Sequence, residues 1–155
     1  MVLVSPPPGP GAPFEVLRAY LDVRASFSPA DFDVVREALL LRRLAAGEFL
    51  QKAGDVTRYA AFVATGCLRN YVIDAKGKEH IVQFAPETWW LADGTSLRDR
   101  TPSTYFIDAI EDSSVLLIEA RPIRSSWTRS PATPPVSALA CSGTRRRRIS
   151  ASSAH

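Results

Sequence analysis

With 155 residues, 46% of them hydrophobic and 23% charged, the sequence has the length and composition of one ordinary globular domain. It contains no run of about eighteen apolar residues that would form a membrane helix, and its N-terminus lacks the basic and apolar blocks of a signal peptide. We therefore expect a cytoplasmic protein with no membrane contact. The net charge of +3 rests on the run Arg145 to Arg148 and gives no general indication of nucleic-acid binding.

Two helices are predicted near the N-terminus, after a proline-rich lead-in. Residues 1–13 carry five prolines and two glycines without a periodic apolar pattern, which predicts a solvated, extended segment. The helical spacing of apolar residues predicts a first amphipathic helix over residues 14–25. Ser28 and Pro29 then predict the N-cap and first turn of a second helix, with Asp31 at the positive end of its dipole.

The stretch from Leu39 to Arg121 changes to strand-like spacing, because short runs rich in β-branched and aromatic residues alternate with turns that contain Gly or Asp. The runs predict strands near residues 40–44, 49–50, 59–65, 67–73, 80–84, 89–91, 105–110 and 114–119. The predicted turns include Gly47, Gly54, Gly66 and residues 74–77. Eight short strands predict a mainly β fold, an antiparallel β-roll of the double-stranded β-helix or jelly-roll type.

The C-terminal part has a different character. Residues 122–155 are rich in Arg, Ser and Pro and contain too few large apolar residues for a core, so we expect a disordered tail. The sequence thus predicts a lead-in over residues 1–13, a β-roll domain over residues 14–121 and a tail over residues 122–155. The abrupt change after Arg121 leads to the hypothesis that the gene is truncated or frame-shifted.

Four segments of the predicted roll follow one another in an order that carries a resemblance. They are residues 44–55, 59–71, 74–79 and 83–90. The first joins an apolar strand to two glycine turns, the second is a hairpin linked by Gly66, the third is a turn, and the fourth leads into a possible ligand cassette. In this order they resemble the cyclic-nucleotide-binding sensor domain of Crp/Fnr-like transcription regulators. The resemblance covers about residues 14–121 and implies a β-roll that senses a small-molecule effector.

The resemblance also implies where a ligand would bind. In nucleotide-binding members of the family, a Gly-Glu pair, a short helix and an Arg-Ser/Thr-Ala string hold the ribose hydroxyl and the cyclic phosphate. Asp93 falls where the ribose-binding glutamate would be, and Ser103 falls where the phosphate-binding arginine would be. Serine lacks the charge and the fork geometry of arginine, and Tyr105 adds bulk where the nucleotide would lie. We therefore predict a degenerate nucleotide pocket, with cyclic AMP or GMP binding in doubt.

The predicted ligand pocket comprises Trp90, Ala92, Asp93, Gly94, Thr95, Ser96, Arg98, Arg100, Ser103, Thr104 and Tyr105. Two alternatives stay open within it. Arg98 and Arg100 supply a substitute cation if their loop folds inward, or else are solvated loop arginines. The backbone amides of residues 94–96 bind an anion, or else simply begin a helix.

Other residues with reactive side chains have ordinary interpretations. Trp89 and Trp90 are adjacent on a strand, so one faces the core and the other faces outward, as a ligand wall or a subunit contact. Cys67 is interpreted as a buried structural thiol and His80 as a plain strand residue, because neither has neighbours at metal-ligand spacing. No catalytic motif occurs, so we predict no catalytic residues, no metal and no cofactor.

Partners follow from the same resemblance. In the family, a long dimer helix and a winged helix-turn-helix come after the roll, but residues 122–155 show neither pattern, so we expect no specific DNA binding by this chain. Apolar surface that the long helix would cover predicts self-association, with a homodimer as the simplest form.

Three functional hypotheses result. The first is an effector-sensing domain of a Crp/Fnr-like regulator, the second is a cyclic-nucleotide-binding module that uses Arg98 and Arg100, and the third is a cupin-like small-molecule-binding barrel.

Overall fold

The structure is a computed structural model, and it describes residues 11–119. Its helices are α1 (Ala12–Asp22), α2 (Pro29–Glu37) and α3 (Gly94–Asp99). Its strands are β1 (Leu39–Leu44), β2 (Phe49–Gln51), β3 (Tyr59–Thr65), β4 (Leu68–Ile73), β5 (Glu79–Ala85), β6 (Trp90–Leu91), β7 (Phe106–Ala109) and β8 (Ser113–Glu119). The predictions for most of the lead-in, residues 1–10, and for the tail, residues 122–155, lie outside the described residues.

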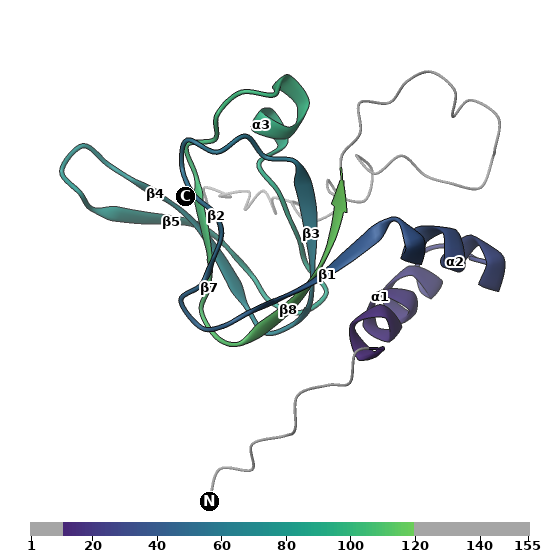
Figure 1. Ribbon diagram of the computed structural model, residues 1–155. Coiled ribbons are helices and arrows are strands. Elements are labelled where there is room, and N and C mark those ends of the chain that lie inside the picture. The colour runs from purple at the N-terminus through teal and green to yellow at the C-terminus, as the bar shows by residue number, and fades with distance from the viewer. Residues whose placement is uncertain (1–10, 120–155) are drawn as a thin grey trace, which may run out of the picture.

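Two four-stranded antiparallel sheets form the roll (Figure 1). Their strand orders are β1-β8-β3-β6 and β2-β7-β4-β5. The first and last strands of the described chain are neighbours, because β1 pairs with β8 from Leu39 opposite Ile118 to Leu44 opposite Ser113. The predicted antiparallel β-roll with two N-terminal helices is thereby confirmed.

The apolar core lies in two layers, one on each side of the sheet β1-β8-β3-β6. Successive side chains of β3 point to opposite faces. Ala61 and Val63 therefore join the cluster between the two sheets, whereas Phe62 joins the cluster beneath α1 and α2. Phe62 is 0% exposed and contacts Tyr20 of α1, with ring centroids 5.2 Å apart. Coverage on both faces explains why β3 is an almost uninterrupted apolar run.

Local chemistry sets where the N-terminal helices begin. The Ser28 hydroxyl accepts a hydrogen bond from the Asp31 amide at 3.2 Å, and the Asp31 carboxylate accepts one from the Ser28 amide at 3.1 Å. This capping box confirms the predicted start of α2. The first helix starts at Ala12 rather than at residue 14 and ends at Asp22 rather than at residue 25. Within residues 11–119, no helix is long and apolar enough to cross a membrane.

The β4–β5 hairpin extends away from the body of the roll (Figure 1). Strand β5 is the edge strand of its sheet, and Ile81, Val82 and Phe84 are all exposed on it. At the turn, His80 Nε2 lies 2.8 Å from Asp74 Oδ2. The hairpin therefore presents apolar side chains beside a strand edge that has no neighbouring strand among the described residues.

Candidate functional site

The short helix α3 at one end of the roll is held by the side chain that precedes it. Asp93 is 7% exposed and serves as the N-cap, because its Oδ1 accepts hydrogen bonds from the amides of Thr95 at 3.0 Å and Ser96 at 3.1 Å. Both amides are thus bonded to Asp93 within the protein. The geometry is that of a capped helix start, and the amides of Thr95 and Ser96 are already engaged by Asp93 instead of being offered to an anion.

Ser96 joins α3 to the loop between β2 and β3. Its hydroxyl is buried, donates to the carbonyl of Thr101 and accepts the amide of Thr57 at 2.9 Å. The Thr57 hydroxyl in turn donates to Gln51 Oε1 at 2.8 Å. A chain of hydrogen bonds therefore runs from the short helix to β2.

Ser103 occupies the position predicted for the phosphate-binding arginine. It is 3% exposed, and its hydroxyl accepts the amide of Tyr105 at 3.0 Å. Its backbone is fixed as well, because its amide donates to Asp55 O at 2.8 Å and its carbonyl accepts from the Gly54 amide at 2.7 Å. The side chain at this position is thus a neutral hydroxyl that already accepts a hydrogen bond from Tyr105.

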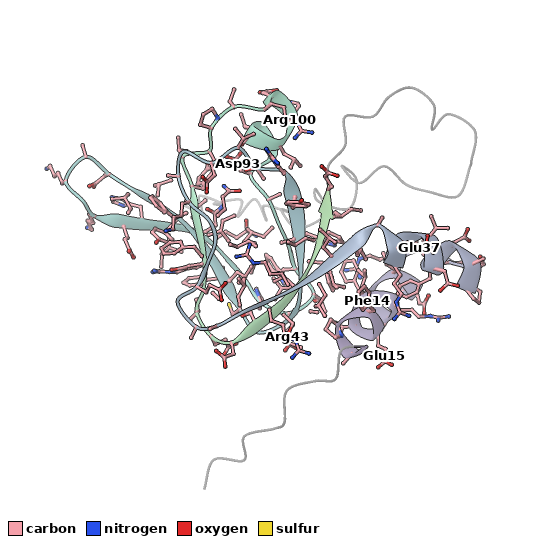
Figure 2. All side chains as sticks on the ribbon, in the orientation of Figure 1. Phe14, Glu15, Glu37, Arg43, Asp93 and Arg100 are labelled. Carbon is pink, nitrogen blue, oxygen red and sulfur yellow. The ribbon has the colours of Figure 1, made fainter. Side chains whose placement is uncertain are left out.

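Arg98 and Arg100 belong to the segment of residues 90–105, here called the cassette, and both are exposed on its outer side. The Arg98 side chain is 73% exposed and binds the carboxylate of the neighbouring Asp99 at 2.8 and 3.1 Å. This hydrogen bond raises the pKa of Arg98 and lowers that of Asp99. Arg100 is exposed at the C-cap in a left-handed conformation with a φ of 55°, near the tip of the cassette in Figure 2. The loop therefore does not fold both arginines inward.

The remaining predicted pocket residues do not all lie at the same place in the fold. Ala92 and Tyr105 are half-buried, and Thr104 is exposed, all close in sequence to Asp93 or Ser103. Trp90 is different, because it packs on Phe62 with ring centroids 5.2 Å apart and belongs to the cluster beneath α1 and α2. The structure thus removes Trp90 from the predicted pocket. The reason is strand alternation, since Leu91 takes the interior side of β6.

A row of carboxamide side chains on the inner face of the sheet β2-β7-β4-β5 was not predicted from the sequence. Gln51 and Asn70 are both paired with the buried Ile107 of β7, and Gln83 is paired with Asn70. Directly opposed residues share a face of the sheet. Asn70 is only 6% exposed. The available signal is an asparagine in the middle of the mostly apolar strand β4, next to Arg69, but its cross-strand neighbours depend on the register.

The buried polar groups carry no positive charge. Among residues 11–119, the buried polar or charged residues are Thr57, Asn70, Asp93, Ser96, Ser103, Asp108, Ser113 and Ser114. Two of them are carboxylates, and the described part of the chain includes no buried lysine or arginine in this set. Only Asp93 of these two belongs to the cassette, because Asp108 is bonded to Arg69 of β4. The buried polar side chains of the cassette are therefore neutral apart from this one carboxylate.

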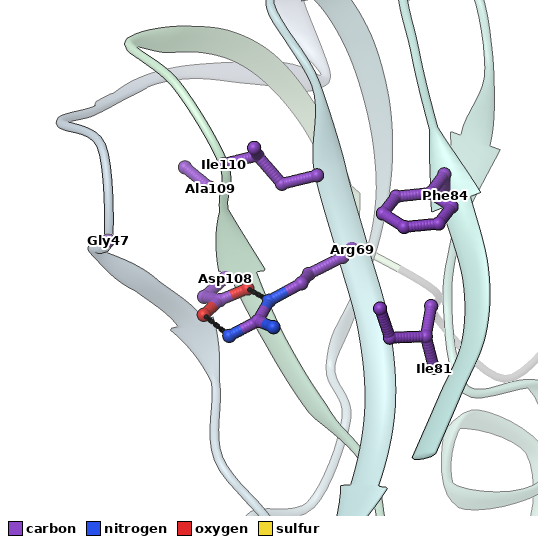
Figure 3. Close-up of a pocket in the computed structure, with 7 residues that line it drawn as sticks. All are labelled: Gly47, Arg69, Ile81, Phe84, Asp108, Ala109 and Ile110. Atoms are coloured by element: carbon purple, nitrogen blue, oxygen red, sulfur yellow. Dashed lines mark hydrogen bonds and ion pairs between the residues drawn. The ribbon is translucent and has the colours of Figure 1, made fainter. Parts of the chain in front are cut away.

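An open hollow of about 350 Å³ lies at the surface, away from the cassette, and contains an ion pair (Figure 3). Its lining residues are Gly47, Arg69, Ile81, Phe84, Asp108, Ala109 and Ile110. Arg69 donates to Asp108 through Nε at 2.8 Å and Nη2 at 2.9 Å, and to Glu79 through Nη1 at 3.0 Å. These bonds to Asp108, chiefly, raise the pKa of Arg69. The guanidinium of Arg69 is therefore already bound by two carboxylates of the protein, those of Asp108 and Glu79.

The other reactive side chains are consistent with structural roles. Cys67 is half-buried, and burial is the main reason that its pKa is raised. A raised thiol pKa lowers the thiolate fraction and with it the reactivity. Among residues 11–119, no group of three or more His, Cys, Asp or Glu side chains is arranged to hold a metal ion.

A two-sheet antiparallel roll with a short helix before β7 defines this chain as a β-roll domain. The model of the cyclic nucleotide-binding domain family matches residues 41–128, more than half of the chain. The chain therefore belongs to the cyclic nucleotide-binding domain family.

Solved structures share this fold at low sequence identity. The sensor domain of the transcriptional regulator DNR from Pseudomonas aeruginosa has a TM-score of 0.58 and 18% identity over 68% of this chain and 69% of that one. The N-terminal domain of a transcriptional regulator from Streptomyces coelicolor A3(2) has a TM-score of 0.54 and 19% identity, covering 61% of this chain and 65% of that one.

The catabolite activator protein of Thermus thermophilus also has a TM-score of 0.54, with 20% identity over 61% of this chain. The match spans only 44% of the Thermus protein. No curated protein matches the sequence significantly.

Proposed function

We propose that residues 14–121 form the effector-sensing roll of a Crp/Fnr-like transcription regulator, with a pocket that does not bind cyclic nucleotides. The observation that carries this proposal is Ser103, which is buried and already hydrogen-bonded where the family's cassette would place an arginine. The family membership supports the sensing role, and the chemistry of the pocket supports the change of ligand.

Electrostatics argues against an anionic ligand inside this roll. A phosphate that leaves water needs a compensating positive charge, and the cost of burial is large without one. In the cassette the buried ionisable group is the Asp93 carboxylate, whereas Arg98 and Arg100 are exposed. A cyclic phosphate would thus be placed near a negative charge rather than a positive one.

Isothermal titration of the full chain with cyclic AMP and cyclic GMP tests this proposal. We expect no binding heat at millimolar nucleotide. Micromolar binding that disappears in an Arg98→Ala, Arg100→Ala variant would overturn it and show that the loop arginines replace the missing cassette arginine. Micromolar binding that survives in this variant would overturn it as well.

The proposed partners are a small-molecule effector and a second copy of the chain. Exposed apolar side chains on β5, Ile81 and Phe84 among them, support self-association. Sedimentation velocity across a concentration series checks this, and a monomer at every concentration would contradict it.

A further inference from the structure

Two buried hydrogen-bonding atoms on the inner wall of the roll have no partner among the described residues. They are Nε2 of Gln51 on β2 and Oδ1 of Asn70 on β4. A buried polar atom without a partner destabilises a fold, because it has lost its hydrogen bond to water. Such atoms are rare in native proteins and call for an explanation.

The two atoms are complementary in their chemistry. The Thr57 hydroxyl bonds the oxygen of the Gln51 carboxamide, and this leaves the nitrogen of that group as the free donor. On Asn70 the free atom is an acceptor. Together they present one donor and one acceptor toward the interior of the roll.

The register brings the two residues to the same part of the sheet. Both are cross-strand neighbours of Ile107, so they share its inner face on either side of β7. With strands about 4.8 Å apart, their Cα atoms are about 10 Å from each other. Their side chains therefore flank that of Ile107 on this face.

We propose that the effector is an uncharged small molecule of the amide or lactam class and that Gln51 and Asn70 bind it. Its carbonyl oxygen accepts from Gln51 Nε2, and its N–H donates to Asn70 Oδ1. Ile107, which is 2% exposed, is the apolar neighbour of both carboxamides. The absence of charge on the ligand follows from the absence of lysine and arginine among the buried residues of the described part of the chain. This inference rests on the sensing role proposed above.

The experiment uses two-dimensional amide NMR spectra of the full chain with millimolar 2-pyridone. The matched control ligand is N-methyl-2-pyridone, which keeps the ring and the carbonyl but has lost the N–H donor. We expect 2-pyridone to shift the side-chain amide signals of Gln51 and Asn70 and the methylated compound to shift them far less. These shifts are expected to disappear in Asn70→Leu, and Gln51→Met serves as the second variant if Asn70→Leu does not fold.

The spectra decide the proposal. Unchanged Gln51 and Asn70 signals at saturating millimolar 2-pyridone would overturn it, as would equal shifts from both compounds. A thermal melt gives an independent readout, because replacing Asn70, whose buried oxygen has no partner, by leucine should raise Tm by about 4 °C. Gln83→Leu is the control, since no atom of Gln83 is among the buried atoms without a partner. A fall in Tm for Asn70→Leu, alongside unchanged spectra, would overturn the proposal. It would indicate that a buried water bonds these carboxamides and that their role is to stabilise the fold.

Failure of this inference is distinguishable from failure of the proposed function. Micromolar cyclic nucleotide binding would defeat the proposed function, whatever 2-pyridone does. If neither cyclic nucleotide nor 2-pyridone binds, the sensing role stands and only the assignment of the ligand class is lost.

Discussion

Arg69 and Asp108 form a two-pronged ion pair between β4 and β7, with Nε–Oδ1 at 2.8 Å and Nη2–Oδ2 at 2.9 Å. The two residues are also directly opposite in the ladder between these strands. The Asp108 side chain is 8% exposed, and the guanidinium lies over the Tyr71 ring at 4.4 Å from its centroid. The pair therefore joins the two central strands of its sheet on the outer face.

Removal of this carboxylate is expected to lower stability strongly. Asp108→Ala leaves a half-buried guanidinium with only its exposed partner Glu79, and the loss should be about 2–3 kcal/mol in the free energy of unfolding. Glu79→Ala is the control and should cost about 0.5 kcal/mol or less, because exposed ion pairs contribute little. Urea unfolding measures both, and equal losses would contradict the structural role assigned to Asp108.

The turn glycine Gly66 has no room for a side chain. A Cβ at this residue would lie against the Ser113 side chain and 2.7 Å from the carbonyl oxygen of Asp112, and its φ is +87°. We expect Gly66→Ala to cost more than about 2 kcal/mol. Gly47→Ala provides the matched control, because Gly47 has a φ of +81° but open space around it, so only about 1 kcal/mol of backbone strain is expected. Similar losses in the two variants would show that the close approach to Ser113 is unimportant.

The side chain that caps α3 is expected to hold the cassette in place. Asp93→Ala removes the acceptor of the Thr95 and Ser96 amides, and the expected loss is about 1 kcal/mol with faster hydrogen exchange at both amides. Asp93→Asn keeps a good N-cap and should leave exchange nearly unchanged. If both variants exchange alike, capping is not what orders this helix.

Acid stability should depend in part on the β4–β5 turn. The His80 ring first, and then the backbone amides of Lys78 and Lys76, hold the pKa of Asp74 below its ordinary value of 3.8. A carboxyl whose pKa is depressed by folding stabilises the folded state above its unfolded pKa, and this contribution is lost as pH falls through the folded pKa.

The Tm of Asp74→Asn should therefore lie below that of the wild type at neutral pH, and the two should converge as pH drops below about 4. Thermal melts across a pH series provide the measurement. Parallel curves for the two proteins over the acid range would refute the contribution of Asp74.

Features that depend on local chemistry could be predicted from the sequence. The Ser28 cap and the turn at Gly66 follow from residue types. The two tryptophans differ in burial as expected, since Trp90 packs on the core and Trp89 is exposed, but Trp89 precedes β6 instead of lying on it. Alternation along a strand therefore does not explain the exposure of Trp89. The sequence predicts Trp90 as a pocket residue, whereas in the structure it packs against Phe62 beneath α1.

Pairings between distant segments could not be predicted. Arg69 and Asp108 meet across 39 positions of sequence. The position of Gln51 depends on an irregularity of β2, since Phe49 pairs with Asp108 but Gln51 pairs with the next residue, Ile107. Such a bulge changes which residues face the interior. The inner row with Asn70 is therefore visible only once the strand register is known.

The pairing of β1 with β8 also bears on how the protein folds. Strand β8 is hydrogen-bonded on both sides, to β1 and to β3, so Leu39 must pair with Ile118 across most of the described chain. Contacts this distant in sequence slow folding, because the chain loses entropy before the contacts form. During synthesis, β1 and β3 lack their common neighbour until residues 113–119 have left the ribosome. Closure of the roll is thus a late step, and destabilised variants spend the interval before it with strand edges open to aggregation.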